Sequence, residues 1–189
     1  MGGAKNEQDL RYRKREKAIV EALVKIVKDE DYALTVRPSR VYREARVSRS
    51  TFRRHYREVG EVFRRKDGEL LREFKRSIKD DELKTAWRKT LIFIVKNREI
   101  FELKFVQADD RLLRKMVEYM EKRMDFGWAK YGTKIKGKVF EMFYAEVVGV
   151  LSIWEKEGMK IERIESAVRE LAHLTKTADK RWGSVVNNL

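Results

Sequence analysis

A single proline, Pro38, stands in a chain of 189 residues, and no other feature constrains the fold as strongly. Antiparallel sandwiches and barrels need many tight turns, which use proline and glycine freely. This chain holds only ten glycines, and 40% of its residues are charged, many of them the helix formers Glu, Lys and Arg. The absence of cysteine excludes a disulfide scaffold and a thiolate zinc site. We therefore predict an all-α protein.

Apolar residues recur at helical spacing along most of the chain, which predicts a succession of helices. These helices are expected at 15–28, from Pro38 onward, and at 49–56, 60–79, 81–96, about 100–105, from Asp109 onward, 139–154 and 161–178. Residues 1–10 read as a frayed lead. Asp67-Gly68 is placed to kink or interrupt the helix at 60–79. We expect a loop where three glycines recur, at Gly127, Gly132 and Gly137.

Positive charge is concentrated in the first third of this chain, whose formal net charge is +14. Residues 1–66 carry 19 Lys and Arg against 10 Asp and Glu, whereas the other 123 residues carry 26 against 21. Between Arg37 and Arg57 there are eight arginines, no lysine and one acid, Glu44. Because guanidinium groups make paired hydrogen bonds to phosphates and base edges, this cluster favours a nucleic-acid partner. A surface that is merely basic is the alternative.

Two short helices joined by a tight turn are expected within this cluster. Pro38 suits the first turn of the first helix, where its missing N–H costs nothing. Ser48 suits the N-cap of the second, with Val47 and Phe52 at the positions of a hydrophobic staple. Phe52 and Tyr56 share one side of that helix. The opposite side carries Ser50, Arg53, Arg54 and Arg57, with Arg49 and Thr51 flanking. This pattern predicts a helix-turn-helix, whose second helix can enter the major groove of DNA.

The segment from Val47 to Tyr56 reads Val-Ser-Arg-Ser-Thr-Phe-Arg-Arg-His-Tyr. It resembles the recognition-helix pattern of the tetracycline-repressor (TetR) family, roughly Val-Ser-x-x-x-Leu-Tyr-x-His-Phe. The resemblance implies base contacts by Arg49, Ser50 and Thr51, and phosphate contacts by Arg53 and His55. The full set of predicted DNA-binding residues is Arg37, Ser39, Ser48, Arg49, Ser50, Thr51, Arg53, Arg54, His55 and Arg57. A basic arm at residues 11–15 is expected either to reach flanking phosphates or to be a solvated tail.

Three positions depart from the family pattern. Arg53 replaces a tyrosine, which keeps a phosphate donor but loses the ring. Arg46 replaces the glycine of the turn, where a side chain must accept or avoid a left-handed conformation at about 1 kcal/mol. Arg37 stands where a threonine starts the first helix of the pair, which leaves Ser39 as a substitute cap. His55 lies near the core boundary on the helical wheel, so a packing role is the alternative to phosphate contact.

The all-helical remainder also resembles the TetR family, in which the last two helices of each subunit form a four-helix dimer interface. Residues 139–154 are apolar at 12 of 16 positions, which requires burial on most sides. Residues 161–178 carry an apolar stripe like a bundle seam. The predicted dimer interface consists of Val147, Val150, Trp154, Ile164, Val168 and Leu171. Alternatively, the two helices complete the core of one monomer.

Aromatic residues are dense between positions 87 and 144, where the family resemblance implies an effector cavity. The candidate lining residues are Trp87, Phe101, Phe105, Tyr119, Phe143 and Tyr144. At helical spacing such residues are more often core than pocket, which is the alternative. An effector in this region should be apolar or aromatic. The predicted organisation is then a helix-turn-helix domain at 1–58, a connecting helix at 59–79, and an effector-binding and dimerisation domain at 80–189.

No motif for catalysis or a cofactor accompanies these features. Phosphate-binding glycine loops, HExxH and GxSxG are missing, and Glu141 and Glu146 lie about 140° apart on a helix. The start of the chain has no apolar signal core, and the longest apolar run, 139–154, is short for a membrane span. We expect a cytoplasmic homodimeric repressor that binds a palindromic operator, with no enzyme activity, metal or cofactor. The alternative is an arginine-rich adaptor for acidic proteins or anionic membranes.

Overall fold

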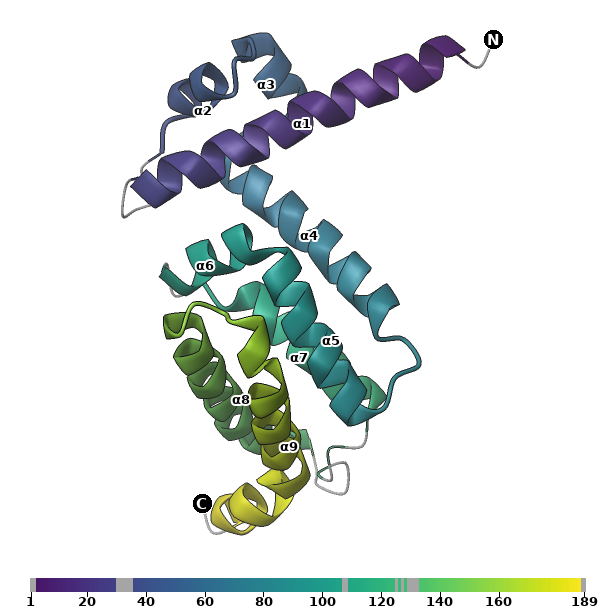
Figure 1. Ribbon diagram of the computed structural model, residues 1–189, viewed down its shortest axis with the longest axis vertical. Helices are drawn as coiled ribbons and strands as arrows, with labels where there is room; N and C mark the ends of the chain where they lie inside the picture. The colour runs from purple at the N-terminus through teal and green to yellow at the C-terminus, as the bar shows by residue number, and fades with distance from the viewer. Residues whose placement is uncertain are drawn as a thin grey trace. The chain divides into compact units, whose positions relative to one another are not determined.

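The computed structural model describes residues 3–29, 36–106, 109–124, 126, 128 and 133–187, and every regular element in them is a helix (Figure 1). The prediction of an all-α protein is confirmed for these residues. The chain divides into two compact units, residues 1–70 and 71–189. The division falls within one helix, α4 (Val59–Ser77), which runs without a break through Asp67-Gly68. The predicted kink or interruption at that dipeptide is therefore wrong.

The first unit holds α1 (Gly3–Asp29), α2 (Pro38–Glu44), α3 (Arg49–His55) and the beginning of α4. Its core joins apolar side chains from all four helices and the turn after α3: Ile19, Leu23, Ile26, Val41, Phe52, Tyr56, Val59 and Val62. The stripe predicted within 15–28 is therefore the buried side of α1. That helix begins much earlier, at Gly3, so the predicted frayed lead is wrong. In Figure 1 the amino-terminal half of α1 extends past α3 as a single rod.

The ends of α2 and α3 follow from local chemistry. Pro38 occupies the first turn of α2, and Arg37 takes the N-cap position without a capping side chain. Ser39, the expected substitute cap, lies inside the helix, because α2 starts one residue before it. Ser48 caps α3 as predicted, since its hydroxyl accepts a hydrogen bond from the Thr51 amide at 3.0 Å. Arg46 adopts the left-handed conformation of the turn, with φ at 53°.

The second unit is a packed set of helices. It contains α5 (Leu83–Lys96), α6 (Arg98–Val106), α7 (Arg111–Arg123), α8 (Thr133–Lys156), the 3₁₀ turn η2 (Ile161–Arg163) and α9 (Ile164–Asn187). α9 packs against both α8 and α5. Gly137 lies within α8, so its assignment to a loop is wrong, while Gly127 and Gly132 lie outside the described residues.

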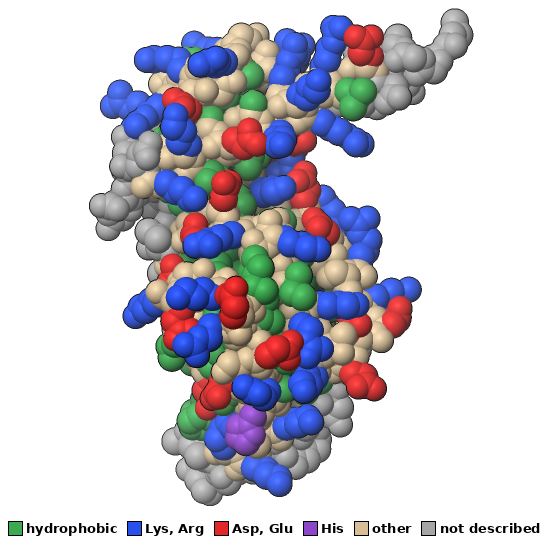
Figure 2. Space-filling view, viewed as in Figure 1, with side chains coloured by type: hydrophobic (Ala, Val, Ile, Leu, Met, Phe, Trp, Pro, Cys, Tyr) green, Lys and Arg blue, Asp and Glu red, His purple; other side chains and the backbone are tan. Residues whose placement is uncertain are grey.

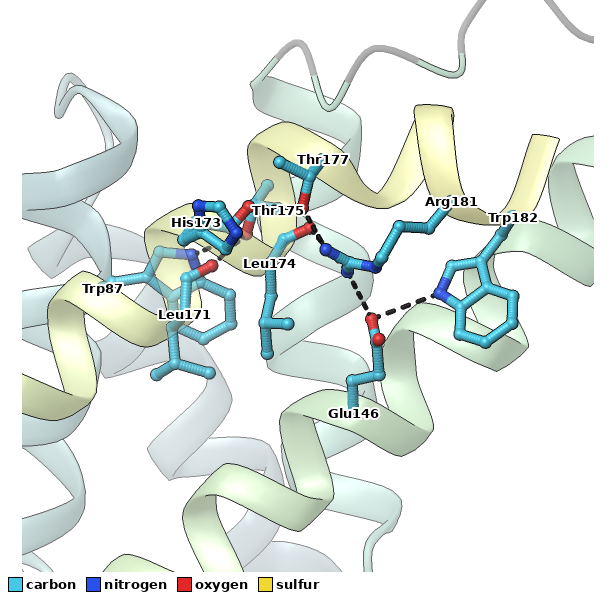
Figure 3. Close-up of polar contacts among 9 residues, drawn as sticks. All are labelled: Trp87, Glu146, Leu171, His173, Leu174, Thr175, Thr177, Arg181 and Trp182. Carbon is cyan, nitrogen blue, oxygen red and sulfur yellow. Dashed lines mark hydrogen bonds and ion pairs between the residues drawn. The ribbon is translucent and has the colours of Figure 1, made fainter. Parts of the chain in front are cut away.

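Two polar contacts hold α9 in this unit (Figure 3). The buried Trp87 indole of α5 donates to the Thr175 hydroxyl at 3.0 Å. Nearer the carboxyl end of α9, Glu146 of α8 accepts from Arg181 at 2.6 Å and from the Trp182 indole at 3.2 Å. Each contact satisfies a polar group that packing has withdrawn from water, so α9 has a defined register against its neighbours.

Candidate nucleic-acid interface

The outer surface of α3 is polar and strongly basic. Ser50, Arg53 and Arg54 are exposed, as are Arg49 at its start and Arg57 just beyond its end. Phe52 and Tyr56 are only 1% and 2% exposed, which fixes the orientation of the helix. The short helix is thus anchored by two aromatic rings, and its exposed residues are those that the helical wheel placed opposite them.

Three of the predicted DNA-binding residues are not exposed: Ser39 of α2 is half-buried, and Thr51 and His55 are buried. Thr51 is 9% exposed, and its hydroxyl accepts a hydrogen bond from Ser48 at 2.9 Å. His55 is 4% exposed and stacks on Tyr12 of α1, with ring centroids 3.9 Å apart. Burial lowers the pKa of His55 below its usual value, although the nearby Glu16 opposes that effect. A buried, neutral imidazole packs and orients, so the structure assigns His55 the packing role.

Tyr12 and Glu16 connect α1 to the helices around His55. The Tyr56 hydroxyl donates to Glu16 at 3.2 Å, and Arg65 of α4 donates to the same carboxylate at 3.1 Å and to the Tyr12 hydroxyl at 3.2 Å. These contacts fix α1 against the end of α3. They went unpredicted, although Tyr12, Glu16 and Ile19 follow the i, i+4, i+7 spacing that marks one helical face.

Most arginines around α2 and α3 have no acidic partner. Six of them are exposed, form no ion pair with any described residue and, unlike Arg40 and Arg46, have no electrostatic interaction with Glu44; we call them the arginine surface: Arg37, Arg43, Arg49, Arg53, Arg54 and Arg57. Figure 2 shows Lys and Arg side chains outnumbering acidic ones over the part of the surface formed by these helices. Glu44, the one acid in the stretch, is held by Lys25 of α1 at 2.5 Å. The positive field of this surface is therefore largely uncompensated.

The predicted dimer residues are mostly interior to the single chain. Val147, Val168 and Leu171 are 0% exposed, Trp154 is 2% and Ile164 is 5%, whereas Val150 is half-buried. Their side chains pack within the unit's own core, as the alternative interpretation held. The side chains that α8 leaves exposed lie on another face and include Ala145, Gly149 and Ile153. Ile153 is 64% exposed, and no atom lies within 4 Å of the position that a Gly149 Cβ would take.

The predicted effector residues divide between core and cavity. Trp87, Phe143 and Tyr144 are at most 3% exposed, and Tyr119 is half-buried beneath Lys75, whose ammonium lies 5.1 Å from the ring centroid. Only two of the six candidates border a cavity of about 310 Å³ between α6, α7 and α8. That cavity is lined by Phe101, Lys104, Phe105, Asp109, Asp110, Leu113, Val148 and Ser152.

One ion pair forms part of this cavity wall. The Lys104 ammonium lies 3.0 Å from Asp109, and the two side chains are 7% and 17% exposed. Arg111 also binds Asp109, at 2.7 Å. Hydrogen bonds from Arg111 and Lys104 hold the pKa of Asp109 well below its usual range. The cavity therefore has apolar walls with a neutralised polar edge, which sequence spacing could not reveal because three helices contribute to it.

Two further properties bear on the kind of site this chain can hold. The described Asp, Glu and His side chains form no group of three or more suited to a metal ion. None of the helices in the described part combines the length and hydropathy needed to cross a bilayer. The arginine surface and the cavity are thus the two sites that the described residues build most clearly.

Comparison with known proteins gives no relative for this chain. No family model matches it, and neither a curated protein nor a solved structure is significantly similar. The likeness to the TetR family therefore rests on residues 47–56 and on the helical character of the remainder.

Proposed function

We propose that the chain is a sequence-specific DNA-binding transcriptional regulator, in which α2 and α3 form a helix-turn-helix and α3 is the recognition helix. The observation that carries the proposal is the arginine surface: six exposed guanidinium groups without acidic partners among the described residues, gathered on and around a capped and anchored helix. Elsewhere in the described part of the first unit, six Lys and Arg side chains lie in ion pairs with Glu, whereas these six do not. Phosphate and base edges supply the missing partners, because they match the geometry of guanidinium donors.

The exposed residues of α3 suit different parts of a duplex. In this proposal Arg49, Ser50 and Arg54 contact base edges, where a paired arginine–guanine contact discriminates by about 1–3 kcal/mol. Arg53 takes the phosphate position that the TetR resemblance implies. Arg37, Arg43 and Arg57 surround the helix and would add phosphate contacts, which position the protein without reading sequence.

The proposed regulator acts as a homodimeric repressor on a palindromic operator, since two-fold symmetry matches two equal half-sites. The dimer would use the outer face of α8 around Ala145, Gly149 and Ile153, because the residues first predicted for it are buried in the monomer. Close backbone approach at Gly149 and burial of Ile153 would both favour a second copy there.

The cavity between α6, α7 and α8 is the proposed effector site. Its volume of about 310 Å³ fits a small ligand, and Phe101, Phe105, Leu113 and Val148 give it apolar walls. A ligand that binds one conformation of the dimer better than another would shift DNA affinity by that difference. We expect a thermal-shift screen to find small apolar or aromatic ligands that Phe105→Ala no longer binds.

Salt-dependent binding tests the proposal. A duplex selected from a random library should lose affinity by a factor on the order of 10³–10⁵ between 50 and 200 mM salt, if about 6–10 phosphates are contacted. The selected duplex should also bind more tightly than a scrambled one at every salt concentration. Failure to select any sequence, together with tighter binding to anionic vesicles than to duplex, would favour the adaptor alternative.

A further inference from the structure

The amino-terminal half of α1 extends past the core of the first unit, and it is rich in cationic side chains. Arg11, Arg13, Lys14 and Arg15 are all exposed on it, and so are the two apolar side chains Leu10 and Tyr12, at 52% and 40%. We infer that this segment, residues 10–17, is a rigid helical arm that binds the phosphates of duplex DNA next to the stretch contacted by α3. The inference rests on the proposed function and extends its binding site to a second element.

The arm is held in place by aromatic and polar contacts. Tyr12 stacks on His55 at the end of α3, and its hydroxyl accepts from Arg65 of α4 at 3.2 Å. Glu16, one turn later, accepts from both Arg65 and Tyr56. A helix fixed at two successive turns cannot swing as a flexible tail does. Its cations therefore keep a defined position relative to α3, and the ordering cost of a disordered arm is avoided.

The cations of the arm lie next to the arginine surface, although Arg11 also pairs with Glu7 on the same helix at 2.6 Å. Tyr12, whose neighbours Arg11 and Arg13 are exposed, stacks on His55 at the end of α3, the residue that follows Arg54. Arg11 lies one turn before Arg15 on the same side of α1, because residues four apart share a helical face. These cations therefore extend from the exposed end of α3 along α1. From Leu10 to Lys17 the helix measures about 10 Å, which equals about three base pairs of duplex.

Duplex DNA suits this arm better than a membrane does. A helix that lies in a bilayer interface needs a broad apolar face, and this segment exposes only Leu10 and part of Tyr12. Duplex DNA carries a charge about every 1.7 Å along its axis, so a short cationic helix meets several phosphates at once. The neighbouring surface on α3 already has the residues for the same polyanion.

The test compares two duplexes that share the selected site and differ by about seven base pairs of flank on each side. The variant Arg11→Gln/Arg13→Gln/Arg15→Gln keeps Tyr12 and Glu16. A matched control, Lys84→Gln/Arg169→Gln/Lys176→Gln, removes three exposed cations of the second unit. On the longer duplex, the arm variant should reduce the slope of log affinity against log salt by about 0.9 for each phosphate that the arm no longer binds. On the short duplex, both variants should match the wild type.

A second variant tests the position of the arm rather than its charge. Tyr12→Ala keeps all the cations, and it should remove hydroxyl-radical protection of the flank while protection of the central site persists. Circular dichroism checks that the helix content is unchanged.

If the arm variant loses affinity equally on both duplexes, or on neither, the proposal that the arm binds flanking DNA is wrong. A loss of anionic-vesicle binding with duplex binding intact would also overturn it. If the wild type selects no duplex at all, the proposed function fails; if the short duplex binds normally and the flank adds nothing, only the arm fails.

Discussion

The arginine surface around α2 and α3 differs from the second unit, and from the ion pairs that the rest of the first unit forms, in how its cations are used. In the described part of the second unit, nine Lys and Arg side chains lie in ion pairs, among them Arg88–Glu165 at 2.6 Å and Arg114–Glu141 at 2.7 Å. Around α2 and α3, six exposed arginines have no acidic partner among the described residues. Under the proposed function, a polyanionic partner accounts for the cations that no described acid of the chain pairs.

Exposed ion pairs contribute little to stability, typically about 0–1 kcal/mol, so the pairing in the second unit is mainly a matter of charge balance. Lys104 and Asp109 are the exception, because both side chains are largely withdrawn from water. Cationic side chains thus occur in three settings: unpaired on the arginine surface, in ion pairs at the surface, and in an ion pair in the interior.

The largest effect should come from the unpaired arginines. Replacing Arg49, Arg53 and Arg54 together with Gln should weaken binding to the selected duplex at least about 100-fold, since each arginine contributes about 1–3 kcal/mol. Fluorescence anisotropy at fixed salt measures the change. The control replaces three paired cations, Arg88, Arg98 and Arg163, and should leave affinity nearly unchanged. Equal weakening in the two variants would show that total charge, and not its placement, governs binding.

The second-largest effect should come from removing the buried ion pair between Lys104 and Asp109. Asp109→Asn removes the carboxylate charge that binds both the buried Lys104 and Arg111, which should lower the free energy of unfolding by about 3 kcal/mol. Chemical denaturation measures it. Glu165→Gln, which breaks the exposed pair with Arg88, should cost under about 1 kcal/mol.

The same pair predicts a pH dependence of stability. In the unfolded chain the pKa of Asp109 is about 3.9, and in the folded protein its pKa is lower. Asp109 therefore contributes its full stabilisation above about pH 3.9, and this stabilisation is lost as the pH falls below that value. Wild-type protein should therefore lose more stability between about pH 7 and pH 3 than Asp109→Asn does. Parallel pH profiles in the two proteins would contradict the assignment.

Removing the Ser48 cap of α3 should have a smaller effect on stability. Ser48→Ala removes the acceptor for the Thr51 amide and should cost about 1 kcal/mol of stability. It should also weaken DNA binding, because a frayed first turn misplaces Arg49. Ser48→Asp, a good capping residue, should restore stability yet bind DNA less tightly than wild type, since its charge repels phosphate. Full recovery of binding by Ser48→Asp would show that the phosphates lie far from this turn.

The smallest effect should appear at Arg46. Its left-handed conformation costs about 1–2 kcal/mol for a side chain, and glycine avoids that strain while losing some unfolded-state advantage. Arg46→Gly should therefore raise the free energy of unfolding by about 0.5–1 kcal/mol and weaken DNA binding. A variant that is more stable and binds equally well would show that the guanidinium has no role in binding.

Local signals predicted the fold well where a helix has one buried face. The Ser48 cap, the anchoring pair Phe52 and Tyr56, and the buried stripe of α1 each depend on neighbours within two turns. The start of α1 was missed because Glu7 and residues 10–15 are exposed, so few buried apolar residues mark its helical period. The break expected in α4 rested on one glycine, whose helix penalty of about 1 kcal/mol the rest of the helix overcomes.

The candidate sites were harder to predict because they depend on contacts between distant segments. Thr51 and His55 sit at the edge of the buried arc of α3, where one neighbouring ring, Tyr12, covers the imidazole. The sequence of an apolar helix such as α8 gives no clue to which of its faces is buried within its own chain. The cavity needs Phe101, Asp110 and Val148 from three segments of the chain. No spacing within one helix encodes that arrangement.

The open surface at Gly149 offers a position at which the chain can be labelled with a fluorophore. The sequence has no cysteine, so Gly149→Cys would carry the molecule's sole thiol, on an exposed turn of α8 with nothing within 4 Å of the added atom. A fluorophore attached there would sit in water on an isolated chain and would be quenched or shielded wherever a second chain covers that face. One labelled position can thus report assembly directly, without a change to the core or to the arginine surface.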